Sequence, residues 1–406
     1  MSKKSTFVAL FIILFQSGLM ATERNIKTEQ NHLSGNNIFS AVNIKPLMEK
    51  VFQWQINHPI VSNEQVENQW ARSTFYSGVM YAFQTTGDNS YLDQTIKWGN
   101  SWNWKRGVRY RHADDLVCGH AYLDAYSIKK DPIMLKGIKS AIDSLIADPK
   151  TGREDWWWCD ALFMAPPVLV RLGSLTNNEK YFSYLDKMYW DATDYLYSPS
   201  DSLFFRDKSF FNAKTKNGSK IFWSRGNAWV IGGLTQMLDM MPKNEPTRSK
   251  YLALYKKIVY KIAALQQPDG LWRASLLDPL QIPAKETSGS TFFTYAMAWG
   301  VNNGILQEKI YAPKIKKAWT SIVQCINEEG KLGYVQPIGA MPENVLAEDN
   351  QEYASGAFLM AGSEMIKMSK IISIENHKVT KKLNVQTRTV VKEDSTLKNI
   401  TKLVIK

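Results

Sequence analysis

The feature that most limits the fold of this chain is a repeated apolar segment that opens on a small residue. Six such segments occur along the sequence, and they begin at Gly78, Gly119, Ala161, Ala228, Gly289 and Gly356. Several of them are followed by a polar turn and then by a second helical pattern. The repeating unit is therefore predicted to be a helical hairpin, present six times between residues 46 and 375.

Six helical hairpins can stack as an open solenoid or close into a ring. An open stack needs terminal units with a polar outer face, whereas the sixth unit here is as apolar as the third. We therefore predict an all-α fold, an (α/α)6 barrel, in which the small residues let the inner helices approach one another. The later units are spaced more widely, which predicts long loops at one end of the barrel, where functional sites usually lie.

The two ends of the chain differ from this central region. Residues 1–21 resemble a secretory signal, with Lys3 and Lys4 before an apolar run that is too short to span a bilayer. Residues 22–45 are polar and are predicted to be a flexible lead-in, and residues 376–406 form a basic tail with short stretches of strand character. We expect an exported protein, periplasmic or secreted, with no membrane attachment after cleavage. An ordinary apolar N-terminal helix fits the flanking lysines less well.

The formal net charge of +12 comes mostly from these ends. The signal contributes two lysines and the tail from Lys378 to Lys406 contributes a net +6, which leaves about +4 for the body (12 − 2 − 6). No basic helix with interleaved aromatic residues is present, so no nucleic-acid partner is expected. Three cysteines and five histidines lack disulfide or metal-ligand spacing, and we predict no disulfide framework, metal or cofactor.

The stretch Asp155–Gly173, DWWWCDALFMAPPVLVRLG, sets three consecutive tryptophans beside the carboxylate of Asp160. Three indoles from one helical turn cannot all point into a core, because neighbouring side chains are about 100° apart. At least one should line a surface or a cavity, where an indole can stack on a sugar ring beside an enclosed carboxyl. The structural alternative is a buried tryptophan cluster with Asp160 capping a helix. Pro166 and Pro167 are expected to bend or break the following segment.

A second acidic pair, Asp114 and Asp115, precedes the second repeated segment as Asp160 precedes the third. Equivalent positions on adjacent hairpins should face the same end of the ring. These carboxylates could therefore pair an acid with a base, or raise one pKa by like-charge proximity. Helix capping is expected to account for one of the two. An Asp-Asp pair also occurs in metal-binding terpenoid enzymes, but the third acid that they need does not follow at the required spacing.

Two arginines could recognise an anionic sugar. In FWSRGNAW, Arg225 stands between Trp223 and Trp229, and arginine binds carboxylates through its planar fork while tryptophan stacks on rings. Arg206, in SLFFRDKSFF, is a second cation nearby. The alternative is a surface loop with a packed tryptophan pair.

The loops before the fifth repeated segment add two weaker candidates. Trp272 could form another sugar platform, and Ser288 could donate a hydrogen bond. Neither a GxSxG elbow nor a Ser/His/Asp order is present, so we propose no serine nucleophile. Cys118 and Cys159 flank the expected site and are interpreted as small buried hydrophobic residues.

Together these motifs resemble glycoside hydrolase family 105, the unsaturated rhamnogalacturonyl hydrolases, and more distantly family 88, the unsaturated glucuronyl hydrolases. The likeness covers about residues 46–370, and its most specific motifs are WWCDALFMAPP (157–167), FWSRGNAW (222–229), DGLW (269–272) and ETSGS (286–290). The resemblance implies that Asp160 is the catalytic acid/base and Asp114 a second important carboxylate. It also implies substrate contacts by Trp158, Trp223, Arg225 and Trp229.

The reaction that this resemblance implies acts on oligosaccharides left by polysaccharide lyases, which end in a 4-deoxy-Δ4,5-unsaturated uronic acid. Asp160 would protonate C4 of the double bond and help water add at C5, after which the hemiketal opens and the sugar is released. The carboxylate-spacing rule of ordinary glycosidases does not apply to this reaction. Many members carry a histidine where this chain has Arg206, which implies a different or a sulfated neighbouring sugar. Rhamnogalacturonan- and ulvan-derived fragments are the expected substrates, and glycosaminoglycan fragments remain open.

Two other functions fit the same residues. A non-catalytic oligosaccharide-binding barrel would use the tryptophans and arginines alone. A polysaccharide lyase could share the fold, although such lyases usually use Tyr/His pairs, which are not convincingly placed in this sequence.

Overall fold

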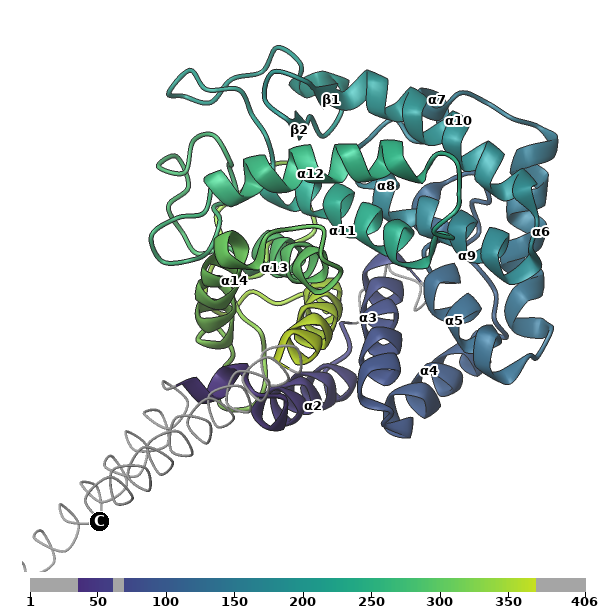
Figure 1. The fold of residues 1–406 in the computed structure, drawn as a ribbon, viewed down its shortest axis with the longest axis horizontal. Coiled ribbons are helices and arrows are strands. Elements are labelled where there is room, and N and C mark those ends of the chain that lie inside the picture. Colours follow the sequence, from purple (N-terminus) through teal and green to yellow (C-terminus); the bar gives the residue numbers. More distant parts are fainter. Residues whose placement is uncertain (1–35, 61–68, 370–406) are drawn as a thin grey trace, which may run out of the picture.

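The computed structural model describes residues 36–60 and 69–369, and most of the regular secondary structure in this region is helical (Figure 1). The predicted signal, the first part of the lead-in and the basic tail lie outside the described residues. None of the described helices is long and apolar enough to cross a membrane.

Six long outer helices each bury one face and expose the other. They are α2 (Ala41–Asn57), α4 (Asn89–Ser101), α6 (Ile133–Ala147), α10 (Glu179–Leu196), α12 (Arg248–Ala264) and α14 (Glu308–Val323). Their apolar positions recur at helical spacing, as in Met134, Ile138 and Ile142 of α6, and this pattern packs an outer helix against an inner one.

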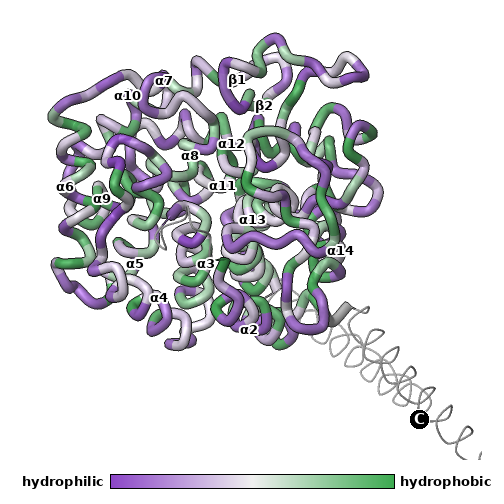
Figure 2. The backbone as a smooth tube through the Cα atoms, turned by 180° about the vertical axis from the view of Figure 1, so that it is seen from behind, coloured by the Kyte–Doolittle hydropathy of each residue, from purple (hydrophilic) through white to green (hydrophobic). Residues whose placement is uncertain are grey.

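The inner helices are buried almost all round, as expected of helices that have neighbours on every side. They are α3 (Trp70–Thr86), α5 (Gly119–Lys129), α8 (Ala161–Met164) with α9 (Pro166–Thr176), α11 (Ser224–Met240), α13 (Thr287–Asn302) and a last helix over 352–369. Hydrophilic stretches of the backbone lie mainly in the loops around this centre (Figure 2).

The first and last inner helices touch, which closes the ring. A Cβ atom on Gly78 of α3 would lie 2.1 Å from the carbonyl oxygen of Gly356, so only glycine allows this approach. The Nδ2 of Asn302, at the end of α13, donates to the carbonyl of Glu364 at 2.9 Å and joins the last helix to its other neighbour. The predicted (α/α)6 barrel is therefore confirmed, with the last helix between α13 and α3 (Figure 1).

The remaining short elements lie before α2 or in the connections between the long helices. They are η1 (Asn36–Phe39), η2 (Ala113–Asp115), α7 (Gly152–Asp155), the antiparallel pair β1 (Tyr197–Ser198) and β2 (Leu203–Phe204), and η3 (Lys208–Phe210). The prolines act as predicted, because Pro166 starts α9 after a break at Ala165.

One sequence-based boundary needs correction. The predicted lead-in over 22–45 ends too late, because α2 already begins at Ala41. Ile44 and Met48 of this helix are buried in the core, so its apolar face and not the polar composition around it decides the boundary.

Candidate active site

A cavity of about 150 Å³ lies at the mouth of the ring. It is lined by Trp70, Asp114, Trp158, Asp160, Met164, Arg206, Trp223, Arg225, Trp229, Ile338 and Gly339. Seven residues predicted from sequence are therefore brought together from η2, the 156–160 turn, the loop after β2 and the start of α11. The two carboxylates face the same small space, as the repeat predicts.

Asp160 stands at the N-cap position of α8, but its side chain makes no capping hydrogen bond to the described residues. The capping interpretation is thus wrong, and the carboxyl is turned to other partners. The Cys159 thiol lies 3.7 Å from Oδ1, and Nε of Arg206 lies 3.8 Å from Oδ2. Burial raises the pKa of Asp160 to about 6, although the nearby charges of Arg206 and Arg225 oppose the shift. Asp160 can therefore hold a proton close to neutral pH.

Asp114 and Asp115 have different surroundings. Burial raises the pKa of Asp114 to about 7, and the charge of Asp160 adds to this shift. Asp115 instead accepts the backbone N–H of Arg109 at 2.6 Å and pairs with its guanidinium at 2.6 Å. One acid of the pair is structural, as expected, but it holds a loop and does not cap a helix.

Arg206 is held in place from one side. Its Nη1 donates to Asp207 at 2.6 Å, and Asp207 in turn accepts from the backbone and hydroxyl of Ser209 at 2.8 and 2.6 Å. The guanidinium lies over the Trp157 ring, 5.2 Å from its centroid. Nε of Arg206 is buried and has no hydrogen-bond partner among the described residues. A fixed cation with an unused donor therefore faces Asp160.

The guanidinium of Arg225 has different hydrogen-bond partners from that of Arg206. Its Nη1 donates to the carbonyls of Gln336 and Pro337 and lies 2.7 Å from the Tyr353 hydroxyl, while Nη2 donates to Gly339 at 3.0 Å. The guanidinium also stacks on Trp223 at 4.4 Å. Its terminal nitrogens are thus occupied by the 336–339 loop that walls the cavity. Arg225 lines the cavity as predicted, but its main contacts position this loop.

The three consecutive tryptophans separate as their spacing requires. Trp156 is buried in the core, Trp158 is 4% exposed and lines the cavity, and Trp157 is 43% exposed beside Arg206. The expectation that at least one indole lines a surface or cavity is confirmed. Trp223 and Trp229 contribute two further aromatic walls.

Trp272 and Ser288 do not reach the cavity, and their predicted substrate contacts are corrected. Trp272 is 0% exposed, its indole N–H donates to the Ile262 carbonyl at 2.7 Å, and its ring packs on Phe293. The Ser288 hydroxyl donates to Glu286, whose carboxylate caps α13. Both residues stabilise the base of the loops, because every polar atom buried there must find a partner.

Sequence reasoning gave no role to several residues at the site. The His112 ring packs on Trp158, with 4.8 Å between centroids, and its Nδ1 lies 3.6 Å from Asp114. Burial lowers the pKa of His112, and the charge of Arg109 adds to this. Trp70 starts the first inner helix, and its place before a repeated segment was a usable signal. Ile338 and Gly339 come from an irregular loop with no such signal.

The described residues contain no group of three His, Cys, Asp or Glu side chains that could hold a metal ion. All three cysteines lie in this part of the chain, where they are buried and free. The cavity itself is lined by two carboxyls, Asp114 and Asp160, and by two arginines, Arg206 and Arg225.

The chain matches the model of glycosyl hydrolase family 88 over residues 47–369. It is 40% identical over 347 residues to the unsaturated 3S-rhamnoglycuronyl hydrolase of Formosa agariphila, covering 80% of this chain and 91% of that protein. A solved family 88 glycosyl hydrolase from Bacteroides vulgatus is 31% identical, covers 80% of this chain and 99% of its own, and has a TM-score of 0.76.

A second similar structure carries a different name. It is called a polysaccharide lyase, is 30% identical, covers 81% of this chain and 98% of its own, and also has a TM-score of 0.76. The family match spans nearly the whole barrel and includes the motifs that build the cavity. The chain therefore belongs to glycosyl hydrolase family 88 and is a glycoside hydrolase.

Proposed function

We propose that Asp160 is the proton donor that removes a terminal 4-deoxy-Δ4,5-unsaturated uronic acid from lyase-generated oligosaccharides. This role is supported by the burial, the pKa and the surroundings of the Asp160 carboxyl. It is buried, its pKa is raised to about 6, and it lies 3.8 Å from a guanidinium that has an unused donor. A group that holds its proton near working pH is suited to general acid catalysis.

The reaction begins when Asp160 gives its proton to C4 of the double bond. The positive charge that develops at C5 is shared with the ring oxygen, water adds at C5, and its proton returns to the Asp160 carboxylate. The C5 hemiketal then opens, and the sugar bonded at C1 is released. Asp114 supports this cycle because two carboxyls in one cavity do not ionise together easily, so that the pair retains a proton up to near neutral pH.

The uronate carboxylate needs a cation, and Arg206 is the better candidate of the two arginines in the cavity. Both guanidiniums have a buried Nε without a hydrogen-bond partner among the described residues. The Nε of Arg206 lies 3.8 Å from Asp160, however, whereas the terminal nitrogens of Arg225 already bind the 336–339 loop. The indole walls of Trp158 and Trp229 would stack on the sugar rings.

For the neighbouring sugar we propose a 3-sulfated rhamnose. The name of the Formosa agariphila relative supports this choice, as does the exposed Trp157 ring beneath Arg206, which offers an aromatic surface for a sugar beside that cation. The signal-like residues 1–21 support export and hence a periplasmic or secreted enzyme.

The test is incubation with unsaturated disaccharides prepared by lyase digestion of ulvan and of rhamnogalacturonan. Hydration destroys the conjugated double bond, so its ultraviolet absorbance should fall with the ulvan product and fall more slowly with the other. Unchanged absorbance together with measurable binding would instead favour a non-catalytic barrel.

The name of one similar structure makes a lyase the second candidate. A lyase acts on the intact polymer and creates double bonds, so the same absorbance would rise with undigested ulvan. A rise on the polymer with no fall on the disaccharide would overturn the proposed hydrolase reaction.

A further inference from the structure

The two oxygens of the Asp160 carboxyl face different surroundings. Oδ2 lies 3.8 Å from Nε of Arg206, which lines the cavity. Oδ1 lies 3.7 Å from the thiol of Cys159, which is 0% exposed and is not part of the cavity lining. Among the described residues, this thiol is the one hydrogen-bond donor to the carboxyl. One oxygen therefore faces the packed wall of the site, and the other faces the space that a substrate can enter.

Cys159 is itself held from two directions. Its backbone N–H donates to the carbonyl of Arg206 at 2.8 Å, which joins the turn that carries Asp160 to the loop that carries Arg206. On another side, a Cβ atom on Gly226, in the first turn of α11, would lie 3.0 Å from Sγ. The thiol therefore fills the space that this glycine leaves. A buried side chain packed in this way has little freedom to turn away from Asp160.

The thiol remains a donor in the pH range in which the enzyme works. Burial raises the pKa of Cys159 well above its ordinary value, and the charge of Asp160 adds to this shift. An S–H group is a weak donor, but its hydrogen bond is strengthened by a charged acceptor and by a buried, low-dielectric setting. Cys159 can therefore hold Oδ1 without giving up its own proton.

From this geometry we propose that Cys159 is a positioning residue that decides which oxygen of Asp160 delivers the catalytic proton. Because Oδ1 accepts the S–H hydrogen bond, the acid proton is placed on Oδ2, on the side of Arg206 and the cavity. Nε of Arg206, at 3.8 Å, is too far away to form a hydrogen bond that would occupy Oδ2.

The catalytic cycle then runs through one oxygen. Oδ2 gives its proton to C4 of the substrate, and the water that adds at C5 returns a proton to the same oxygen. The thiol keeps its proton throughout and holds Oδ1 in both states of the carboxyl. The direction of proton delivery rests on the proposed function, whereas the hydrogen bond between the thiol and Asp160 does not.

The other charged groups around Asp160 cannot replace the thiol in this role. They are Arg206 and Asp207 from the loop after β2, Arg225 from α11 and Asp114 from η2. Their charges shift the pKa values of the site through space, but none of them forms a hydrogen bond with the Asp160 carboxyl in the described part of the chain. Only the thiol makes a directed contact with a single oxygen.

The first experiment observes this contact through the infrared S–H stretching band. It uses the full chain with Cys118→Ala and Cys325→Ala, which leaves Cys159 as the one thiol in the sequence. The band should move to lower wavenumber as pH rises through about 6, because S–H donates more strongly to a carboxylate than to a carboxylic acid. In the same background, Asp160→Asn should abolish this movement. A band that responds neither to pH nor to Asp160→Asn would overturn the proposal.

The second experiment measures kcat and KM for the unsaturated disaccharide as a function of pH. Cys159→Ala should lower kcat by about three- to tenfold with KM nearly unchanged, because proton delivery is misdirected while the substrate contacts remain. The fall of kcat/KM should also move to higher pH, since the thiol hydrogen bond lowers the pKa of Asp160. Cys159→Ser keeps a donor at this position and should restore both quantities toward the wild-type values.

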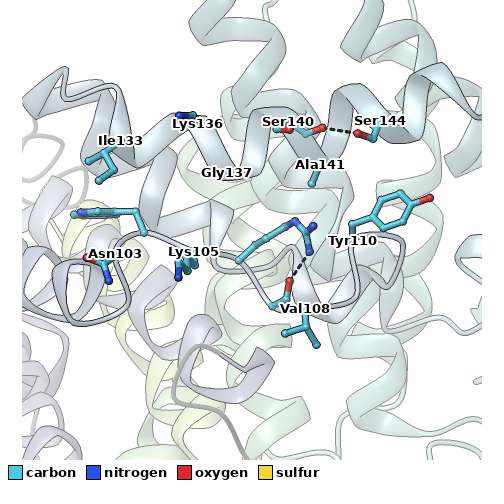
Figure 3. Close-up of a pocket in the computed structure, with 13 residues that line it drawn as sticks. Asn103, Lys105, Val108, Tyr110, Ile133, Lys136, Gly137, Ser140, Ala141 and Ser144 are labelled. Atoms are coloured by element: carbon cyan, nitrogen blue, oxygen red, sulfur yellow. Dashed lines mark hydrogen bonds between the residues drawn. The ribbon is translucent and has the colours of Figure 1, made fainter.

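The matched control is Cys118→Ala, which removes a second buried thiol at the N-cap position of α5. This thiol lies 3.9 Å from the carbonyl of Asp115, which also accepts the N–H of Gly107 at 3.0 Å. Gly107 belongs to residues 103–110, which line a hollow outside the barrel together with α6 and are absent from the catalytic cavity lining (Figure 3). The control should therefore lose a similar amount of stability but keep the wild-type kcat and pH profile.

The positioning role would be overturned by a Cys159→Ala protein whose kcat and pH profile match those of the wild type. It would also be overturned if the serine variant were as slow as the alanine variant, or if Cys118→Ala caused an equal loss, because lost packing would then explain the effect. Failure of the proposed function is read separately. In that case the wild type leaves the disaccharide absorbance unchanged, while the S–H band still responds to Asp160→Asn.

Discussion

Two pairs of buried arginine and aspartate residues have the same side-chain chemistry but different roles. One pair lies at the centre of the barrel and the other at its mouth. At the centre, Arg171 of α9 donates to both oxygens of Asp124 of α5, at 2.8 and 3.0 Å, and also to Gln236 of α11. At the mouth, Arg206 and Asp160 are 3.8 Å apart, and Nε of Arg206 has no hydrogen-bond partner among the described residues.

The difference lies in how completely the donors are matched. A buried ion pair whose hydrogen bonds are all made holds helices together, and removing one partner leaves an uncompensated charge. In a pair whose arginine has an unpaired donor, that donor can still bind an anionic ligand, but leaving it unpaired lowers the stability of the fold. The central pair is therefore structural, and the pair at the mouth is the one that can bind and react.

The largest effect among the substitutions that test these two roles is expected for Asp160→Asn. We expect kcat/KM on unsaturated disaccharides to fall by about 1,000-fold or more, because the proton donor is lost. The pKa of this carboxyl rises from its ordinary 3.8 to about 6 on folding, so the folded state binds the proton more tightly. The stability that this proton provides is lost as pH rises through about 6. Asparagine should therefore raise the free energy of unfolding at pH 8 by about 1 to 3 kcal/mol.

Denaturant unfolding of both proteins at pH 5 and pH 8 provides the measurement. The stabilisation should be larger at pH 8 than at pH 5. An inactive variant that is less stable at both values would mean that Asp160 holds the fold and that its catalytic role is not demonstrated.

Asp124→Asn should give the opposite result. The charge of Arg171 would remain buried without its partner, and we expect the free energy of unfolding to fall by about 3 to 5 kcal/mol. The folded fraction should keep near-normal kcat/KM at low temperature, because Asp124 does not line the cavity. A loss below about 1 kcal/mol by chemical denaturation would contradict the structural role of this pair.

Arg206→Gln should lower kcat/KM by about 10- to 100-fold, mainly through KM, because the unused donor facing the substrate is removed. Activity needs protonated Asp160, so kcat/KM should fall as pH rises through about 6 in the wild type. Arg206 lowers the pKa of Asp160, and its removal should move this fall to higher pH.

The matched control is Arg206→Lys, which retains the charge but not the planar fork. Its pH profile should stay close to that of the wild type. If the glutamine variant shows no shift of the profile, Arg206 does not act on Asp160.

The smallest effect on catalysis is expected for Trp272→Phe. This substitution removes the indole donor from the Ile262 carbonyl, which keeps only the Leu265 N–H, and it opens a small space, so stability should fall by about 1 to 3 kcal/mol. KM should not change, whereas Trp158→Phe in the cavity should raise it. A rise in KM for the Trp272 variant would mean that this residue contacts the substrate after all.

Much of the site could be predicted because the repeat places equivalent residues at one end of a ring. Asp114 and Asp160 precede successive inner segments, and once the ring is closed they must face the same mouth. The same logic failed for Trp272 and Ser288, which also precede an inner segment. Whether a residue before a helix points inward or into the packing beneath depends on loop conformation, which spacing does not specify.

By itself, the sequence determined the helical hairpins, the closure of the ring and the residues gathered at its mouth, because periodicity and small residues act locally and repeat. Only the tertiary structure decided which of two arginines is bound by a loop through its terminal nitrogens, and which aspartate of an adjacent pair is structural. Those outcomes depend on hydrogen-bond partners contributed by distant segments, such as the carbonyls of 336–339 that occupy Arg225.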